Sequence, residues 1–193
     1  MEAQETAELI EQSGHGGTSQ NRSALTISIL AMVLAIASLG GSNAMKEATQ
    51  ENILAANAYA FYQAKNIRQT TYKLAAADLE LQMAREPNMN ANAKAMFEKK
   101  LEDYKKTVER YESEPETKEG KKELMVRAKE HEAARDHAMR QDPWFDYAEG
   151  MLQIAIVLLS VSIVASVPAL YWAGSVLGAL GFLSTVNGYF LLF

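Results

Sequence analysis

The last 47 residues of the chain form two long apolar runs that only Pro168 separates, and no charged side chain follows Glu149. In lipid, every backbone polar group must find its hydrogen-bond partner within the segment, so runs of this length predict membrane-spanning helices. Proline lacks an amide hydrogen and disfavours helical geometry in the residue before it, so the first helix should stop there. The pattern predicts a transmembrane hairpin over residues 143–193, with spans at 147–167 and 169–193.

A third apolar run, residues 24–41, carries no charge and is about 27 Å long as a helix, just enough to cross a bilayer. Small side chains recur along it at helical spacing, notably Ala31, Ala35 and Ser38. Faces of small residues let helices approach closely in membranes, so we expect this face to pack against another helix. Gly40–Gly41 should loosen the helix where it leaves the bilayer. Residues 1–23, acidic and partly glycine-rich, should form a flexible tail.

Residues 42–142, between these apolar runs, combine charged and apolar positions at helical spacing. Up to Glu86 this part has no proline or glycine and is rich in good helix formers. Apolar residues repeat there every seven positions, with mostly small residues between them: Ile53, Ala60, Ile67, Leu74 and Leu81. A heptad pattern of this kind predicts a helix that packs closely against another helix.

The chain should turn at Pro87 and return in two further helical segments. The first has a second heptad seam: Phe97, Leu101, Tyr104, Val108 and Tyr111. Residues 113–116 interrupt it, a third helix over 118–140 follows, and Asp142-Pro143 should open the next helix as N-cap and first residue. Because the outgoing and returning arms have similar lengths, we expect an antiparallel, coiled-coil-like hairpin in water. A bundle folded down onto the lipid headgroups is the alternative.

The fold is therefore predicted to be all-α, with three transmembrane helices and a long soluble helical hairpin. Three spans put the hairpin on the same side of the membrane as the C-terminus. Near the membrane, the positive charges on the hairpin side outnumber Arg22 of the tail: Lys46, Lys129, Arg135 and Arg140. Positive charge favours the cytoplasmic side, so we expect a cytoplasmic hairpin.

Composition excludes several functions. The 19 basic residues are outnumbered by 24 acidic ones, and a nucleic-acid-binding protein would show the opposite balance. The chain has 0 cysteines, which excludes disulfides, thiolate metal sites and thiol catalysis.

The segment Asn57–Arg68, with Tyr62-Gln63-Ala64-Lys65 at its centre, resembles the hallmark of an uncharacterised family of bacterial membrane proteins catalogued as domain of unknown function 4337. The apolar span before it and the run after Tyr147 agree with that family in order and spacing, so the resemblance extends from Ser23 to the C-terminus. It implies a multi-pass protein of the bacterial inner membrane with a helical soluble insert. It implies no activity, substrate or cofactor. Where the family often has Trp near the start of the hallmark, this chain has Tyr59.

Four residues of the hallmark helix share one face by their spacing: Phe61, Lys65, Arg68 and Tyr72. Basic groups beside aromatic rings could dock an acidic protein partner. The alternative is a solvated face whose long side chains cover the neighbouring arm.

The His131-Glu132-x-x-Arg135 segment is similar to a zinc motif, but its second ligand position holds Arg, so we predict no metal site. No catalytic constellation or cofactor site is evident, and the chain is predicted not to be an enzyme.

A Gly-x-x-x-Gly pair and a further glycine give the last span a small face: Gly174, Gly178 and Gly181. It could pack within the monomer or between copies. Together with the heptad seams, it predicts a homo-oligomeric scaffold or assembly protein, which contacts the bilayer, itself and an unidentified protein partner. The alternative is one subunit of a small oligomeric channel or transporter, favoured by the serines in the spans.

Overall fold

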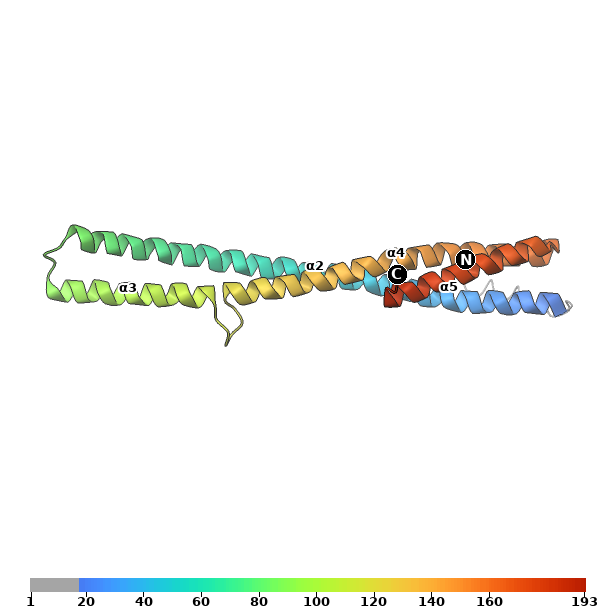
Figure 1. The fold of residues 1–193 in the computed structure, drawn as a ribbon, viewed down its shortest axis with the longest axis horizontal. Coiled ribbons are helices and arrows are strands. Elements are labelled where there is room, and N and C mark those ends of the chain that lie inside the picture. The colour runs from blue at the N-terminus through green and yellow to red at the C-terminus, as the bar shows by residue number, and fades with distance from the viewer. Residues whose placement is uncertain (1–17) are drawn as a thin grey trace. The chain divides into compact units, whose positions relative to one another are not determined.

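The computed structural model describes residues 18–193, with side chains from Asn21 onward, and this part of the chain is helical without strands (Figure 1). Its four helices are α2 (Thr18–Arg85), α3 (Ala91–Glu112), α4 (Lys121–Ala165) and α5 (Pro168–Phe190). Three of them, α2, α4 and α5, are long and apolar enough to cross a membrane. The prediction of an all-α fold is confirmed. The predicted tail lies outside the described residues up to residue 17, and residues 18–23 are already helical.

The helix α2 is continuous over 68 residues and is not itself a hairpin. The expectation that it loosens at Gly40–Gly41 was wrong. Both glycines lie against the ring of Phe145 on α4: a Cβ on Gly40 would come within 2.7 Å of its Cζ, and one on Gly41 within 3.2 Å of its Cβ. The glycines therefore serve close packing between helices, and the packing holds them in the helix.

The helix α4 also continues where we expected a break, because Pro143 lies inside it and does not open a new helix. A proline in a helix interior leaves one carbonyl without its usual donor and lowers stability. Here Ala138, Phe145 and Ala148 on either side of the proline are at most 2% exposed. The buried contacts of these neighbours keep the helix intact through the proline.

The predicted breaks at Pro87, at residues 113–116 and at Pro168 are all confirmed. After Pro87, the side chain of Asn90 accepts a hydrogen bond from the amide of Asn92 and caps α3. Before Pro168, Ser166 adopts a left-handed conformation with φ of 55°, and the proline then starts α5. Here the local geometry of proline decided the outcome, and no distant contact was needed.

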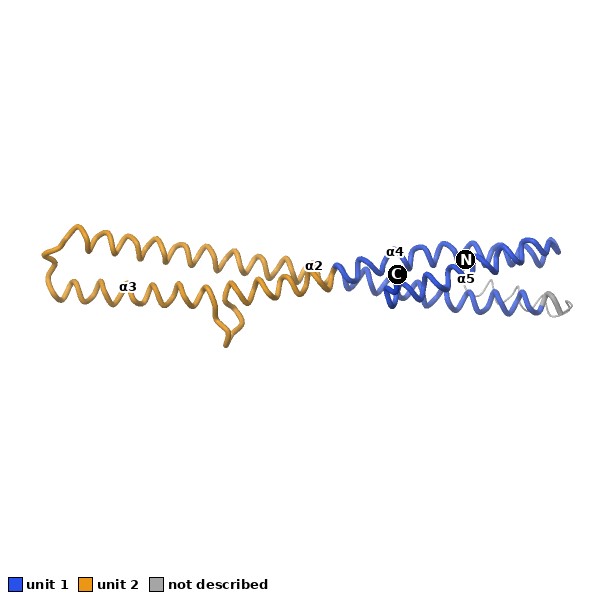
Figure 2. The backbone as a smooth tube through the Cα atoms, in the orientation of Figure 1, with its two compact units in different colours: residues 1–49, 136–193 blue, residues 50–135 orange. Residues whose placement is uncertain are grey.

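The chain divides into two compact units (Figure 2). Of the described residues, unit 1 comprises 18–49 and 136–193 and unit 2 comprises 50–135, whereas the sequence suggested boundaries after residues 41 and 142. The helices α2 and α4 contribute to both units.

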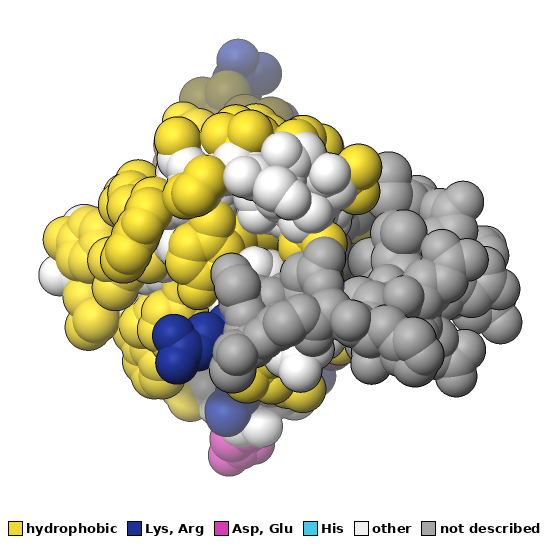
Figure 3. Space-filling view, turned by 90° about the vertical axis from the view of Figure 1, so that its right-hand side faces the viewer, with side chains coloured by type: hydrophobic (Ala, Val, Ile, Leu, Met, Phe, Trp, Pro, Cys, Tyr) yellow, Lys and Arg dark blue, Asp and Glu magenta, His cyan; other side chains and the backbone are white. Residues whose placement is uncertain are grey.

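The core of unit 1 forms where α2, α4 and α5 meet, around Leu30, Phe145, Leu152 and Leu159. Its surface is apolar as well. Large hydrophobic side chains on all three helices are exposed, among them Met32, Leu39, Val157, Val164, Trp172 and Leu183. In the apolar window of each helix, only 28–33% of the residues are buried. Figure 3 looks onto one end of unit 1, where the side chains drawn in colour are mostly hydrophobic.

In unit 2, α3 and the first part of α4 run antiparallel to α2 (Figure 1). The ring of Tyr72 on α2 lies 5.4 Å from that of Tyr104 on α3, and the Tyr59 hydroxyl reaches Glu132 on α4. On α2, the contacting residues follow four-three spacing and are called here the inner seam: Ala55, Ala58, Tyr62, Lys65, Gln69, Tyr72 and Ala76. The predicted seam of α3 is confirmed, since all five of its residues are buried or half-buried.

The predicted seam of α2, in contrast, faces away from the rest of the unit. We call its residues the outer stripe: Ile53, Ala60, Ile67, Leu74 and Leu81. Its four large side chains are 48–67% exposed. The assignment to packing within the chain was wrong because α2 has two heptad patterns on opposite faces. The inner seam, with its alanines, lets the helices approach closely, although it is less hydrophobic than the outer stripe.

Candidate functional site: the polar junction of unit 2

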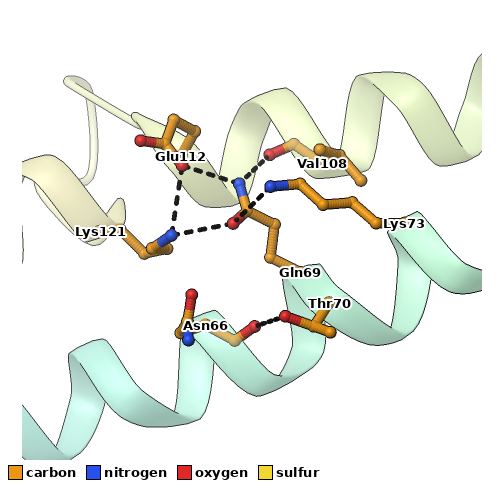
Figure 4. A network of polar contacts seen from close by, with 7 residues as sticks. All are labelled: Asn66, Gln69, Thr70, Lys73, Val108, Glu112 and Lys121. Atoms are coloured by element: carbon orange, nitrogen blue, oxygen red, sulfur yellow. Dashed lines mark hydrogen bonds and ion pairs between the residues drawn. The ribbon is translucent and has the colours of Figure 1, made fainter.

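A buried glutamine joins the three helices of unit 2 where α3 ends and α4 begins (Figure 4). The Gln69 side-chain amide on α2 donates hydrogen bonds to the backbone oxygen of Val108 at 3.0 Å and to Oε2 of Glu112 at 2.9 Å, both on α3. Its Oε1 accepts one from Nζ of Lys121, the first residue of α4, at 2.9 Å. Gln69 is 1% exposed, so each of these bonds compensates for the lost contact of its amide with water.

The Lys121 ammonium also lies 3.3 Å from Glu112 and 5.5 Å from the centre of the Tyr62 ring. An ammonium and a carboxylate therefore both bond to Gln69, with an aromatic face beside the Lys121 cation. Lys73 adds a second ammonium, 3.3 Å from Gln69 Oε1.

A second cluster, around Lys65, lies beside the α3–α4 connection. The Lys65 ammonium is 3.8 Å from Glu114 and 3.5 Å from Glu119, and it lies 5.5 Å from the centre of the Tyr111 ring. The connection is also tied to α4, because the hydroxyl of Ser113 donates a hydrogen bond to Glu123. Ser113 is also the C-cap of α3.

Two carboxylates of the junction are held in their charged form. The pKa of Glu112 lies below its ordinary value of 4.5, first because Gln69 donates a hydrogen bond to it and further because of Lys121. The pKa of Glu123 is lowered from the same ordinary value of 4.5, chiefly by the hydrogen bond from Ser113. Both shifts favour the ionised carboxylate at neutral pH.

Further along the α2–α4 contact, His131 Nδ1 lies 2.6 Å from Glu51 Oε2, and the Tyr59 hydroxyl donates to Glu132 at 3.0 Å. The bond to Glu132 raises the pKa of Tyr59 above 10.0, because it stabilises the neutral phenol. Across the described residues, no three His, Cys, Asp or Glu side chains come together in a way that could hold a metal ion. The two contacts, His131 with Glu51 and Tyr59 with Glu132, join α2 to α4.

The four residues proposed for docking a protein partner do not lie on one open surface. Lys65 is engaged with Glu114 and Glu119, and the ring of Tyr72 meets that of Tyr104 edge to face. Phe61 and Arg68 are exposed. Docking of a protein partner by the four residues stays a prediction.

The glycines of α5 lie buried inside unit 1. A Cβ on Gly178 would meet Leu30 of α2, and Cβ atoms on Gly174 and Gly181 would meet Leu159 and Leu152 of α4. The small face predicted on the first span lies mostly on the surface of unit 1. Ala31 is half-buried, whereas Ala35 and Ser38 are exposed. Contact of that face with a further helix stays a prediction.

A family model described as domain of unknown function (DUF4337) matches residues 19–191. The chain belongs to this family. The predicted resemblance is thereby confirmed over almost the whole chain. No curated protein and no solved structure matches the chain.

The hallmark segment of this DUF4337 chain contributes directly to the junction. Within Tyr62-Gln63-Ala64-Lys65, Tyr62 lies beside Lys121 and Lys65 beside Tyr111, whereas Gln63 and Ala64 point outward. Sequence reasoning missed Gln69 and Lys121. The one available signal was spacing: Gln69 follows Tyr62 and Lys65 at seven and four residues, so all three share a helical face.

Proposed function

We propose that this DUF4337 protein is a non-enzymatic, membrane-anchored scaffold that assembles with copies of itself. Unit 1 lies in the bilayer of the bacterial inner membrane, and unit 2 lies in water on the cytoplasmic side. The observation that carries the proposal is the surface of unit 1, where large hydrophobic side chains of α2, α4 and α5 are exposed around a core that includes glycine and alanine. Such a surface is costly in water and favourable in lipid.

The contacts of unit 2 support a structural role. Its buried Gln69 side chain bonds to α3 and α4 of the same unit, so it holds the helices together. In a catalytic cleft, by contrast, the side chain that acts as an acid, a base or a nucleophile would face an open cavity.

Unit 1 has an open groove of about 350 Å³, and its lining is almost entirely apolar. The lining includes Trp144, Tyr147, Leu183 and Phe193. In a bilayer such a groove suits lipid chains, and Trp and Tyr suit the depth of the headgroups. Two of the serines in the spans donate hydrogen bonds to backbone oxygens: Ser160 to Ile156 and Ser184 to Trp144.

Crosslinking of surface amines in native membranes tests the scaffold proposal. The exposed lysines of unit 2, such as Lys94 and Lys106, should link neighbouring copies into dimers or larger species. Membranes dissolved in denaturing detergent before the reagent is added serve as the control and should give monomer. A monomer at every expression level in intact membranes would contradict self-assembly.

A further inference from the structure

We propose that the outer stripe of α2 is the surface through which two copies of this chain pair, as a parallel, in-register coiled coil. This inference rests on the proposed self-assembly and specifies its interface. Within unit 2, α3 and α4 leave this face of α2 uncovered, and Ile53, Ile67 and Leu74 are 55%, 66% and 67% exposed.

The spacing of the stripe fits a helix as its partner. Its residues recur every seven positions over residues 53–81. On a straight α-helix such a stripe would drift by about 20° per heptad, so only a second helix that supercoils with α2 can follow it. The inner seam on the opposite face has the same period and is occupied by α3 and α4. The helix α2 thus has two heptad faces, and within unit 2 only the inner seam is covered by other helices.

The positions that lie three residues after each stripe residue complete the interface. These positions are all exposed and hold small or uncharged side chains: Ala56, Gln63, Thr70, Ala77 and Ala84. Large residues alternating with small ones form the a and d positions of a closely packed pair. No charged side chain would be buried in this core.

The flanking charges identify the partner as a second copy in parallel orientation. In a parallel coiled coil, a residue at position g faces the residue five places later on the other helix. When the stripe is position a, Lys73 is at g and faces Asp78 of the second copy, and Glu80 is at g and faces Arg85. Both contacts join opposite charges, and symmetry repeats each of them on the other side of the interface.

These four side chains are exposed. Within α2, Lys73 donates to Gln69 at 3.3 Å and Asp78 accepts from Gln82 at 2.6 Å. Within one chain, Glu80 pairs with Lys105 on the surface, with both side chains more than half exposed. Exposed ion pairs contribute little, so exchange of partners costs little. A shared membrane anchor gives neighbouring copies one orientation, and their α2 helices then run in the same direction, as the parallel register requires.

The absence of native cysteine makes the interface testable with single substitutions in the full-length protein in its membrane. Under mild oxidation, Ile67→Cys, Leu74→Cys and Leu81→Cys should each give disulfide-linked dimers, because a disulfide requires Cα atoms closer than about 7 Å. The matched control is Phe61→Cys, an exposed apolar residue of the same helix that lies outside the stripe. It should give no dimer.

A second variant tests the energetics. Ile67→Asp combined with Leu74→Asp should weaken self-association by more than about tenfold, since each substitution removes one large apolar side chain from the interface. Because both residues are exposed in one chain, the helicity and thermal unfolding of unit 2 should not change. Loss of helicity would show that the stripe is needed inside the monomer and would overturn the proposal.

The outcomes separate this inference from the proposed function. If amine crosslinking shows oligomers while no stripe cysteine forms a dimer, the interface lies elsewhere and only this inference fails. If no oligomer forms at all, both fail. Stripe cysteines at Ile67 that link to a different protein would overturn the assignment of a second copy, and dimers at Ile67 without dimers at Leu81 would overturn the parallel register.

Discussion

The ring of Phe145 on α4 lies so close to Gly40 of α2 that a Cβ at this glycine would come within 2.7 Å of the ring's Cζ. Gly40→Ala should therefore force the two helices apart or the ring out of its position, at a cost of about 1–3 kcal/mol. The matched control is Gly150→Ala in α4, where an added Cβ meets no neighbouring atom within 4 Å. Thermal unfolding in mild detergent should show a lower midpoint for Gly40→Ala and an unchanged or higher one for the control.

Gln69 should be the most sensitive polar residue of unit 2. Its replacement by Ala removes the donors to Val108 and Glu112 and the acceptor for Lys121, leaving buried polar groups without partners. We expect a loss of about 1–3 kcal/mol in the free energy of unfolding. Gln82→Ala, at an exposed position of the same helix outside both heptad faces, should change stability by no more than about 0.5 kcal/mol. Equal effects of the two substitutions would contradict the role given to the junction.

The junction should weaken in acid. A carboxylate whose pKa is lower in the folded state than its unfolded value of 4.5 stabilises the fold above that value, and the contribution is lost as pH falls through the folded pKa. Glu112 and Glu123 both follow this rule, so amides at the α3–α4 connection should lose protection against hydrogen exchange, relative to the intrinsic rate at each pH, below about pH 4.5. Glu112→Gln should reduce this pH dependence. Protection factors in the wild type that stay constant over this range would argue against a role of these carboxylates in stability.

Substitution by a charged residue should have different effects at two exposed valines of α4. Val157 belongs to unit 1 and Val126 to unit 2, and their side chains are 47% and 56% exposed. If unit 1 lies in lipid, Val157→Lys should cost about 2.5–3.5 kcal/mol of insertion energy and lower the amount of protein in the membrane. Val126→Lys should have little effect. Membrane fractionation after alkaline washing measures the difference, and similar yields for both variants would count against the assignment.

The helix ends that depend on local chemistry could be predicted from the sequence. Pro87 and Pro168 end helices through their missing amide hydrogen and their effect on the preceding residue, so both breaks could be placed from the sequence. Pro143 and Gly40–Gly41 could not be read correctly, because their helices are kept continuous by packing around Phe145, which lies far from Gly40 in the sequence. Distant contacts of this kind override local propensity.

The two faces of α2 show a second limit. The heptad pattern correctly indicates that α2 packs against other helices, but hydrophobicity alone favours the outer stripe, which is not the face used within the chain. Alanines and the polar Gln69 form the actual contact, since they allow close approach and complete the hydrogen bonds of α3 and α4. Periodicity reports that a face has a partner and leaves open which partner it is.

The location of unit 1 in the bilayer can be measured with single cysteines in this cysteine-free chain. Val157→Cys and Val126→Cys are each treated with a water-soluble maleimide that reaches both faces of the membrane. We predict rapid labelling at residue 126, and labelling at residue 157 only after detergent is added, because a thiol in hydrocarbon neither meets the reagent nor ionises. Equal labelling of the two cysteines in intact membranes would contradict the membrane anchor.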